Sequence, residues 1–331
     1  MAQKILEQIV SIAGNTPGSG SLSKATVDLT IGVRYLVLWL IGTVKRSGTS
    51  STAPVLGDIF DLTSTCKVKL NGKTQREFTI AELDAIQRSY GAAYGINVTG
   101  GTDTGGAPKA GDTVTYRVPI YFYQDWRPGY SARDLFAWPT AWPDGSQLKT
   151  FQVEVPLAAK DNTADNVTTL HAFSVYAEYD NVLGSMKDGK PMFNIEKWAR
   201  LIVPYSAAGN LPLTNLDRRD FLEQFTFFAQ TADPISHVVV KMNGRVYRDA
   251  PKALLDESIR KRAMVIADQP SYLGNIAAAD RLDVVFEDTD NPLDSLPLFS
   301  AASFEVTPTL ASASASNKAL TLLQLRYGAP D

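Results

Sequence analysis

The sequence has few of the side chains that carry most enzyme chemistry. Its 331 residues include two histidines and one cysteine, and they contain no recognisable cofactor motif. The lone Cys66 excludes an intrachain disulfide and is typical of a protein made in a reducing compartment. A net charge of -3 argues against a chain whose main task is to bind nucleic acid directly. We therefore expect no cofactor and interpret the chain as one that builds a surface.

Long apolar runs are also scarce. The strongest, residues 29–44, is shorter than a membrane-spanning helix requires and contains Arg34. It is rich in Val, Ile, Leu and aromatic residues, which favours one or two buried strands. The first residues are too polar for a secretory signal, so we expect no export by that route.

Strand signals dominate the rest of the chain. Asn71-Gly72 and Asn243-Gly244 are the strongest short hairpin signal, one in each half. Alternation of apolar and polar residues, or a strand-rich composition, marks further segments: 113–123, 151–157, 169–179, 282–286 and 319–327. The sequence therefore predicts a mainly β protein.

Four segments are expected to be helical. Residues 1–13 form an amphipathic pattern carried by Lys4, Ile5, Leu6, Ile9, Val10 and Ile12. A Gly/Ser/Pro linker over residues 15–24 follows, so this helix either docks onto another molecule or packs on its own domain. The other three are a capping box starting at Thr79, residues 215–230 and residues 251–262.

A polar, glycine-bearing stretch at 184–191 is the expected domain boundary. The expected division is an N-terminal helix and linker (1–24), a first β domain (25–185) and a second one (186–331). Long connections between strands favour jelly rolls, which pack two four-stranded sheets. The predicted fold class is all-β, with two tandem eight-stranded jelly rolls and a few inserted helices.

Several segments carry a resemblance to a known family: 111–120, 173–183, 297–299, 302–306 and 320–327. In order and character they resemble the double jelly-roll major capsid proteins of tailless, membrane-containing icosahedral viruses of the tectivirus and corticovirus type. The resemblance implies homotrimers that form pseudo-hexagonal blocks in a virion shell, after a period in the host cytoplasm. It also implies contacts with penton or vertex proteins, with minor capsid proteins, and with an internal membrane through the N-terminal helix.

The remaining candidates are less distinctive. Asp288, Asp290 and Asp294 could hold a divalent cation, although Pro292 indicates an ordinary loop. Possible inter-subunit contacts are Trp138, Trp142, Arg260 and Arg262.

An alternative function is a carbohydrate-binding or carbohydrate-cleaving β-sandwich. The aromatic stretch Phe136, Trp138 and Trp142 would then stack on sugar, and the nearest acids are Asp144 and Glu154. A loop anchor or a subunit interface is the simpler interpretation of these rings.

Overall fold

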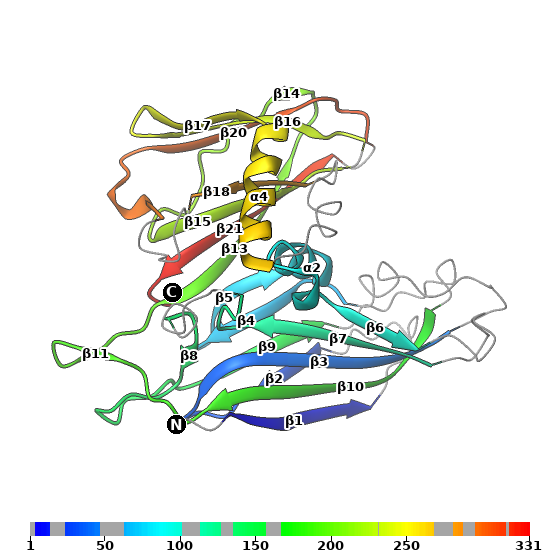
Figure 1. Cartoon of the computed structure of the whole chain (residues 1–331), viewed down its shortest axis with the longest axis vertical. Helices are drawn as coiled ribbons and strands as arrows, with labels where there is room; N and C mark the ends of the chain where they lie inside the picture. Colours follow the sequence, from blue (N-terminus) through cyan, green and yellow to red (C-terminus); the bar gives the residue numbers. More distant parts are fainter. Residues whose placement is uncertain are drawn as a thin grey trace.

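The computed structural model is a mostly β protein whose strands form two layered barrels, one above the other in Figure 1. It describes residues 4–13, 24–46, 63–100, 113–126, 135–156, 167–230, 232–267, 281–286, 295–315 and 318–331. Within those ranges it contains two α-helices, α2 (Ile80–Arg88) and α4 (Lys252–Ala267), and the short 3₁₀ turns η1 (Ala92–Tyr94) and η5 (Leu298–Ser300). The expected all-β class with a few inserted helices is confirmed.

The first barrel packs two layers of strands against each other. Its outer layer has the order β1-β10-β3-β7-β6, with β8 paired to β3. The bounds are β1 (Ile5–Ala13), β10 (Val167–Asp180), β3 (Arg34–Arg46), β7 (Thr113–Tyr121), β6 (Asn97–Gly100) and β8 (Trp138–Pro139). The facing layer is β5 (Lys73–Phe78), β4 (Cys66–Leu70), β9 (Phe151–Pro156) and β2 (Lys24–Asp28).

The second barrel repeats this plan. One layer is β13 (Ile195–Pro204), β21 (Ala319–Gly328), β15 (Phe221–Phe228) and β18 (Arg281–Val285), with β19 (Leu296–Pro297) on β15. The other layer is β14 (Gly209–Asn210), β20 (Phe304–Leu310), β16 (Ile235–Met242) and β17 (Arg245–Pro251). A two-stranded hairpin, β11 (Met186–Lys187) and β12 (Lys190–Pro191), lies where the domain boundary is expected; the boundary itself stays a prediction.

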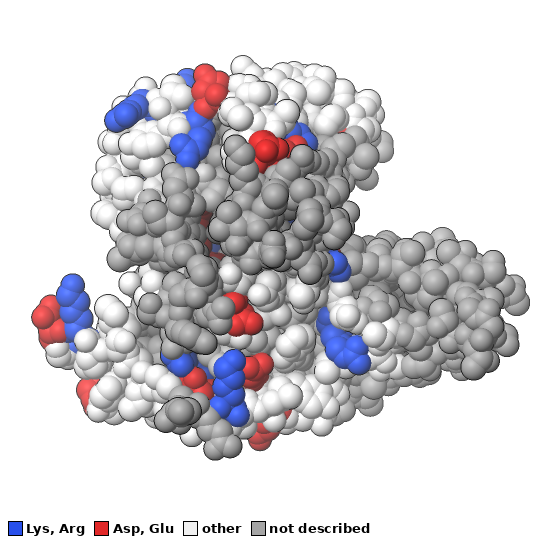
Figure 2. Space-filling model, in the orientation of Figure 1, with Lys and Arg blue, Asp and Glu red and all other residues white. Residues whose placement is uncertain are grey.

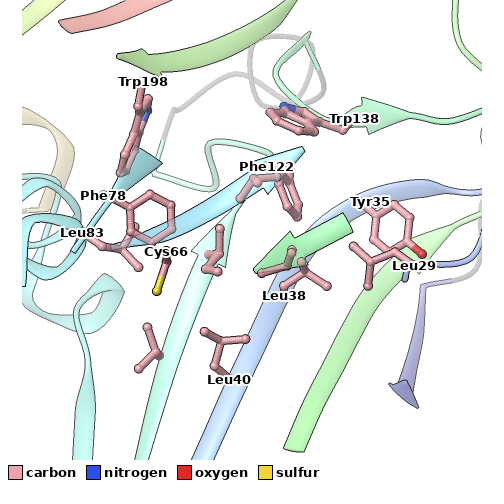
Figure 3. Packing of buried hydrophobic residues seen from close by; sticks show 14 of the residues in the cluster. Leu29, Tyr35, Leu38, Leu40, Cys66, Phe78, Leu83, Phe122, Trp138 and Trp198 are labelled. Atoms are coloured by element: carbon pink, nitrogen blue, oxygen red, sulfur yellow. The ribbon is translucent and has the colours of Figure 1, made fainter. Parts of the chain in front are cut away.

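Each barrel encloses an apolar core because alternate residues of its strands point inward. In the first, Leu38 and Leu40 of β3 pack with Cys66 of β4 and Phe78 of β5 (Figure 3). The second core gathers its own set of leucine, valine and phenylalanine residues from β15, β16, β18, β20 and β21. The run expected to supply buried strands, residues 29–44, does so through β3, on which Leu38 is fully buried.

The locally encoded features are confirmed. Asn71 and Asn243 adopt φ of 48° and 53°, followed by glycines at 80° and 76°, so both Asn-Gly pairs turn hairpins. Thr79 caps α2 by a reciprocal hydrogen-bond pair with Glu82, the capping box expected there. The helix expected over residues 251–262 is α4.

Two helix predictions are wrong, and they share a cause. Residues 5–13 form strand β1, paired antiparallel with β10, and the segment within 215–230 forms strand β15. The pairing register shifts between Gln8 and Val10 in β1 and between Leu222 and Gln224 in β15. Such a shift adds one residue to the alternation, so two residues that face the core across it are three positions apart, a spacing that also occurs on a helix.

Candidate assembly site

The sheet of the second barrel that contains β13 and β21 lies between the two cores. On β21, Leu320 and Leu322 pack in the second core, whereas Leu323 and Leu325 pack in the first. On β13, Trp198 belongs to the first core. A parallel bridge between Trp198 and Arg76 joins β13 to β5, so one nine-stranded sheet runs through both barrels. The barrels therefore share a buried seam.

Arg76 of β5 is the central cation of this seam. Its guanidinium is buried and lies 5.5, 5.0 and 5.1 Å from the ring centroids of Phe122, Trp138 and Trp198, the last across the seam. Figure 3 labels these three rings. It donates to the backbone oxygens of Glu196, at 3.0 Å, and Tyr121, at 2.6 Å. Desolvation lowers the pKa of Arg76, and the negative charge of Glu196 opposes that shift. Aromatic faces and a paired carboxylate thus stabilise a cation that water cannot reach.

Glu196 of β13 accepts hydrogen bonds from both barrels. Its carboxylate lies 3.4 Å from the Arg76 guanidinium and accepts hydrogen bonds from Gln124 in the first barrel and from the indole of Trp198. All four side chains are nearly or fully buried. Buried charges that lose a partner are costly, so this cluster fixes how β13 lies against β5.

A second ionic cluster holds the last residues of the chain against the seam. Lys197 pairs with Asp220 at 2.7 Å and with Asp331 at 2.9 Å. Arg326 pairs with Asp220 at 2.7 Å and with Asp217 at 2.9 Å. The backbone amide of Asp331 donates to Gln75 of the first barrel, so this cluster also reaches both barrels.

Asp217 is the titratable group of this cluster with the clearest shift. Burial opposes its ionisation, but the hydrogen bonds from Arg219 and the charge of Arg326 outweigh burial. Together they lower the pKa of Asp217 to about 2. The carboxylate therefore stays charged and paired over the whole neutral range.

Helix α2 reaches the second barrel from the first. Arg200 of β13 donates to both carboxylate oxygens of Glu82, at 3.0 and 2.9 Å. Arg281 of β18 donates to the carbonyl oxygen of Ala85, in the last turns of α2 where carbonyls lack helical partners. These contacts extend the seam from β5 and β13 to the far edge of the sheet, between the barrels in Figure 1.

The contacts of the seam hold the two barrels in one orientation. The seam combines an apolar layer, a caged arginine and ion pairs buried between the barrels, which oppose rotation of one barrel against the other. Among the described residues no group of three or more His, Cys, Asp or Glu side chains lies close enough to hold a metal ion. The geometry therefore suits a stiff building block.

The two tryptophans expected at subunit contacts are buried within the chain. Trp138 is 0% exposed, with its ring 4.6 Å from that of Phe122. Trp142 is also buried, and its indole donates to the carbonyl oxygen of Met192 at 3.4 Å. Strand β8 and the turn after it fold both rings inward within the chain, and a contact with a neighbouring subunit stays a prediction.

The N-terminal candidates line the edge strand β1. Lys4 pairs with Glu178 of β10 at 3.2 Å and lies over the ring of Tyr123. Ile5, Ile9 and Val10 pack against the first core, whereas Leu6 is exposed; the Ile12 side chain lies outside the described residues. The segment therefore packs on its own domain, and a contact of its exposed face with another molecule stays a prediction.

Other sequence candidates are placed only in part. Arg260 and Arg262 lie on α4, but their side chains are outside the described set. Asp288, Asp290 and Asp294 fall in a segment that the structure does not describe, so the cation site stays a prediction. In the described parts of the chain, no helix is long and apolar enough to cross a membrane.

The seam itself was not found by sequence reasoning. Its members are charged residues inside strands, for example Arg76 within β5 and Glu196 and Lys197 within β13. Such residues on strands that are otherwise apolar are the available signal, because charges are rarely buried without partners. Their partners lie far away in the sequence, so the pairing could not be read from it.

The distribution of charged side chains on the face in Figure 2 differs from that of a nucleic-acid-binding surface. Figure 2 shows basic and acidic side chains in small mixed groups, without a continuous patch of one sign. A nucleic-acid surface would instead gather basic residues along one stripe.

The fold is that of the double jelly-roll capsid proteins of viruses. No protein-family model and no curated protein matches the sequence. Among solved structures, the chain is similar to the major capsid protein of bacteriophage PM2, with 13% identity and a TM-score of 0.64 over 99% of this chain and 98% of that one.

Two further similar structures come from other viruses. The major capsid protein of Sulfolobus Turreted Icosahedral Virus gives 13% identity and a TM-score of 0.66, over 99% and 97% of the two chains. The PBCV-1 virus capsid protein gives 10% identity and a TM-score of 0.60, over 99% and 94%. These likenesses span both barrels, so the predicted resemblance is confirmed at the level of the fold.

Proposed function

We propose that this chain is a major capsid protein, a structural component of a virion shell and not an enzyme. The observation that carries the proposal is the pair of jelly rolls joined by a buried seam, a fold shared over nearly the whole chain with viral capsid proteins. A shell needs subunits that keep one shape while many copies assemble. The caged Arg76 and the ion pairs around Lys197 supply that stiffness.

The proposed building block is a homotrimer. Two similar barrels per chain place six barrels in a three-fold ring, which approximates a hexagon and tiles a curved shell. Such a ring uses heterologous contacts that close on themselves, in which one barrel of each copy meets the other barrel of the next. The sheet that runs through both barrels supports this, because it fixes the angle between them.

The proposed setting is an icosahedral shell around an internal membrane, with penton or vertex proteins and minor capsid proteins as partners. Before assembly the chain would stay in the host cytoplasm. We do not assign the membrane contact to an N-terminal helix, because residues 5–13 form an edge strand of the first barrel.

No observation favours the carbohydrate alternative. Phe136, Trp138 and Trp142, the rings expected to stack on sugar, are all buried. Glu154 forms an ion pair with Lys69 at 2.5 Å, and Asp144 accepts hydrogen bonds from Ser146 within a turn.

The direct test is the native mass of the purified full chain, measured by light scattering behind a sizing column. Three copies of a 36.0 kDa chain give about 108 kDa, and that value should persist on dilution. A stable monomer would refute the trimer.

A second test addresses contacts between trimers. We expect Arg260→Glu with Arg262→Glu on α4 to block shell formation while trimers persist, because a neighbouring acid would lose its partner. Lys67→Glu with Arg117→Glu, on strands β4 and β7, is the matched double charge reversal outside α4. Normal shells from the Arg260 and Arg262 variant would show that α4 lies away from the contacts between trimers.

A further inference from the structure

Four tight turns gather at one end of the molecule, which we name the tight-turn end. They are the turns at Asn71-Gly72, Asp144-Gly145, Asp188-Gly189 and Asn243-Gly244, in each of which at least one residue has a positive φ. The hairpin β11–β12 projects from this side in Figure 1, where the mark for the C-terminus also lies. Two of the turns come from the first barrel, one from the connection between the barrels and one from the second barrel.

Hydrogen bonds near these turns connect them across both barrels. Asn71 accepts from the amide of Lys149, and the Trp142 indole of the next turn donates to Met192 beside the hairpin. The chain end follows, where Arg219 donates to Asp331 at 3.1 Å. Next to Arg219, Arg218 donates to Ala302, whose amide donates to Asn243. The surface therefore runs across both barrels.

Large apolar side chains are exposed on this surface. Leu183 is 46% exposed, Met192 42% and Phe299 60%, and Leu135 lies beside the first two. Leu135, Leu183 and Met192 line a groove of about 350 Å³. These four are half of the eight large hydrophobic side chains that are exposed in the described part of the chain. Exposed apolar groups gathered in one region mark an interaction surface.

The same end is basic although the whole chain is acidic. Its exposed basic residues are Lys73, Lys149, Lys187, Lys190, Arg218 and Arg219. Its exposed acidic residues are Asp144 and Asp188, and the half-buried Asp217 and Asp331 offset Arg219. The chain as a whole has a net charge of -3, so the excess of positive charge at this end is not a property of the whole molecule.

From these side chains we propose that the tight-turn end is a docking surface for an anionic lipid bilayer. Leucine, methionine and phenylalanine enter the boundary between headgroups and acyl chains, while lysine and arginine attract the negative headgroups around them. A second copy presenting this same end would bring like charges together, which disfavours self-pairing. Nucleic acid would match the charge but leave the exposed Leu183, Met192 and Phe299 without apolar partners.

The inference deepens the proposed function, because it names the surface that would face the internal membrane. A single copy binds weakly, since each basic side chain near an anionic surface contributes only about 1 kcal/mol. Trimers and larger assemblies would multiply these contacts. This docking does not involve strand β1. The membrane contact expected for that segment assumed that it was a helix.

The test is flotation of the purified full chain with vesicles of phosphatidylcholine, with or without phosphatidylserine, at low and at high salt. We expect binding only to vesicles with phosphatidylserine, and release at high salt. The double variant Lys187→Ala/Lys190→Ala should bind about 30-fold more weakly, which is the loss of two basic contacts of about 1 kcal/mol each. Met192→Ser/Phe299→Ser should weaken binding to phosphatidylserine vesicles at low salt without changing the charge of this end.

The matched control is Lys67→Ala/Arg117→Ala, which removes the same charge from residues within strands β4 and β7, away from this end. It should bind as the unmodified chain does, and circular dichroism should show that every variant is folded. Failure of the unmodified chain to float, or equal binding by the Lys187 and Lys190 variant, overturns the proposal.

The native mass separates this inference from the proposed function. A trimer that does not float overturns only the lipid inference, whereas a monomer that floats overturns only the shell. If Met192→Ser/Phe299→Ser breaks the trimer and the unmodified chain does not float, the surface is an interface between copies. Salt-sensitive binding to a DNA oligonucleotide, without vesicle binding, would assign it to nucleic acid.

Discussion

Replacing Arg76 with methionine tests whether the seam holds the two barrels together. Methionine fills much of the same space among Phe122, Trp138 and Trp198 but has no charge and no N–H donor. The Arg76→Met variant leaves the backbone oxygens of Glu196 and Tyr121 without these donors, and it leaves the Glu196 carboxylate buried without its cation.

The size of the effect follows from burial. Removing one partner of a buried ion pair costs about 3–5 kcal/mol, because the other charge stays buried and unpaired. Arg76 is 2% exposed, so water cannot take its place without opening the seam. We therefore expect Arg76→Met to lower the free energy of unfolding by about 3–5 kcal/mol.

The assay is unfolding by guanidinium chloride, followed by tryptophan fluorescence, which reports Trp138 and Trp198 beside the substituted residue. Arg117→Met, at a half-exposed arginine of β7, is the control and should stay within about 0.5 kcal/mol of the unmodified chain. Adding Glu196→Gln to Arg76→Met should recover about 1–3 kcal/mol, since the unpaired charge is then gone. A loss below about 1 kcal/mol for Arg76→Met would refute the reasoning.

Three further predictions concern single positions. Burial opposes ionisation of Asp217, but the hydrogen bonds from Arg219 outweigh burial and lower its pKa to about 2. The ionised carboxylate therefore stabilises the fold at pH values above the pKa of Asp in the unfolded chain, about 4. This contribution to stability is lost as the pH falls from about 4 to about 2. Asp217→Asn should therefore flatten acid unfolding in that window, and an unchanged acid transition would contradict this. Gly42→Ala should destabilise the first barrel by about 1–3 kcal/mol in thermal unfolding, because its Cβ would lie 2.1 Å from the buried Tyr116 ring; an unchanged melting temperature argues against the close contact. Burial raises the pKa of the Cys66 thiol to about 12, so Cys66 should react with a thiol reagent at neutral pH only when the chain unfolds, and rapid labelling of the folded protein would contradict its burial.

The sequence by itself determined the features that depend on neighbouring residues. Asn71-Gly72 turns a hairpin because these two residue types tolerate positive φ, and Thr79 caps α2 because Glu82 stands three positions later. The two jelly rolls follow from strand patterns spread along the whole chain, together with the resemblance in their order. Such signals need no knowledge of distant contacts.

Tertiary structure alone decided strands β1 and β15 and the seam. In β1 and β15 a shift of the pairing register interrupts the alternation, and only pairing with β10 or β21 shows that the backbone is extended. Trp138 could be assigned to a surface or a core only once β8 was placed on β3. Arg76 and Glu196 are 120 residues apart, and a buried charge is stable only beside its partner, so their roles appear when the barrels meet.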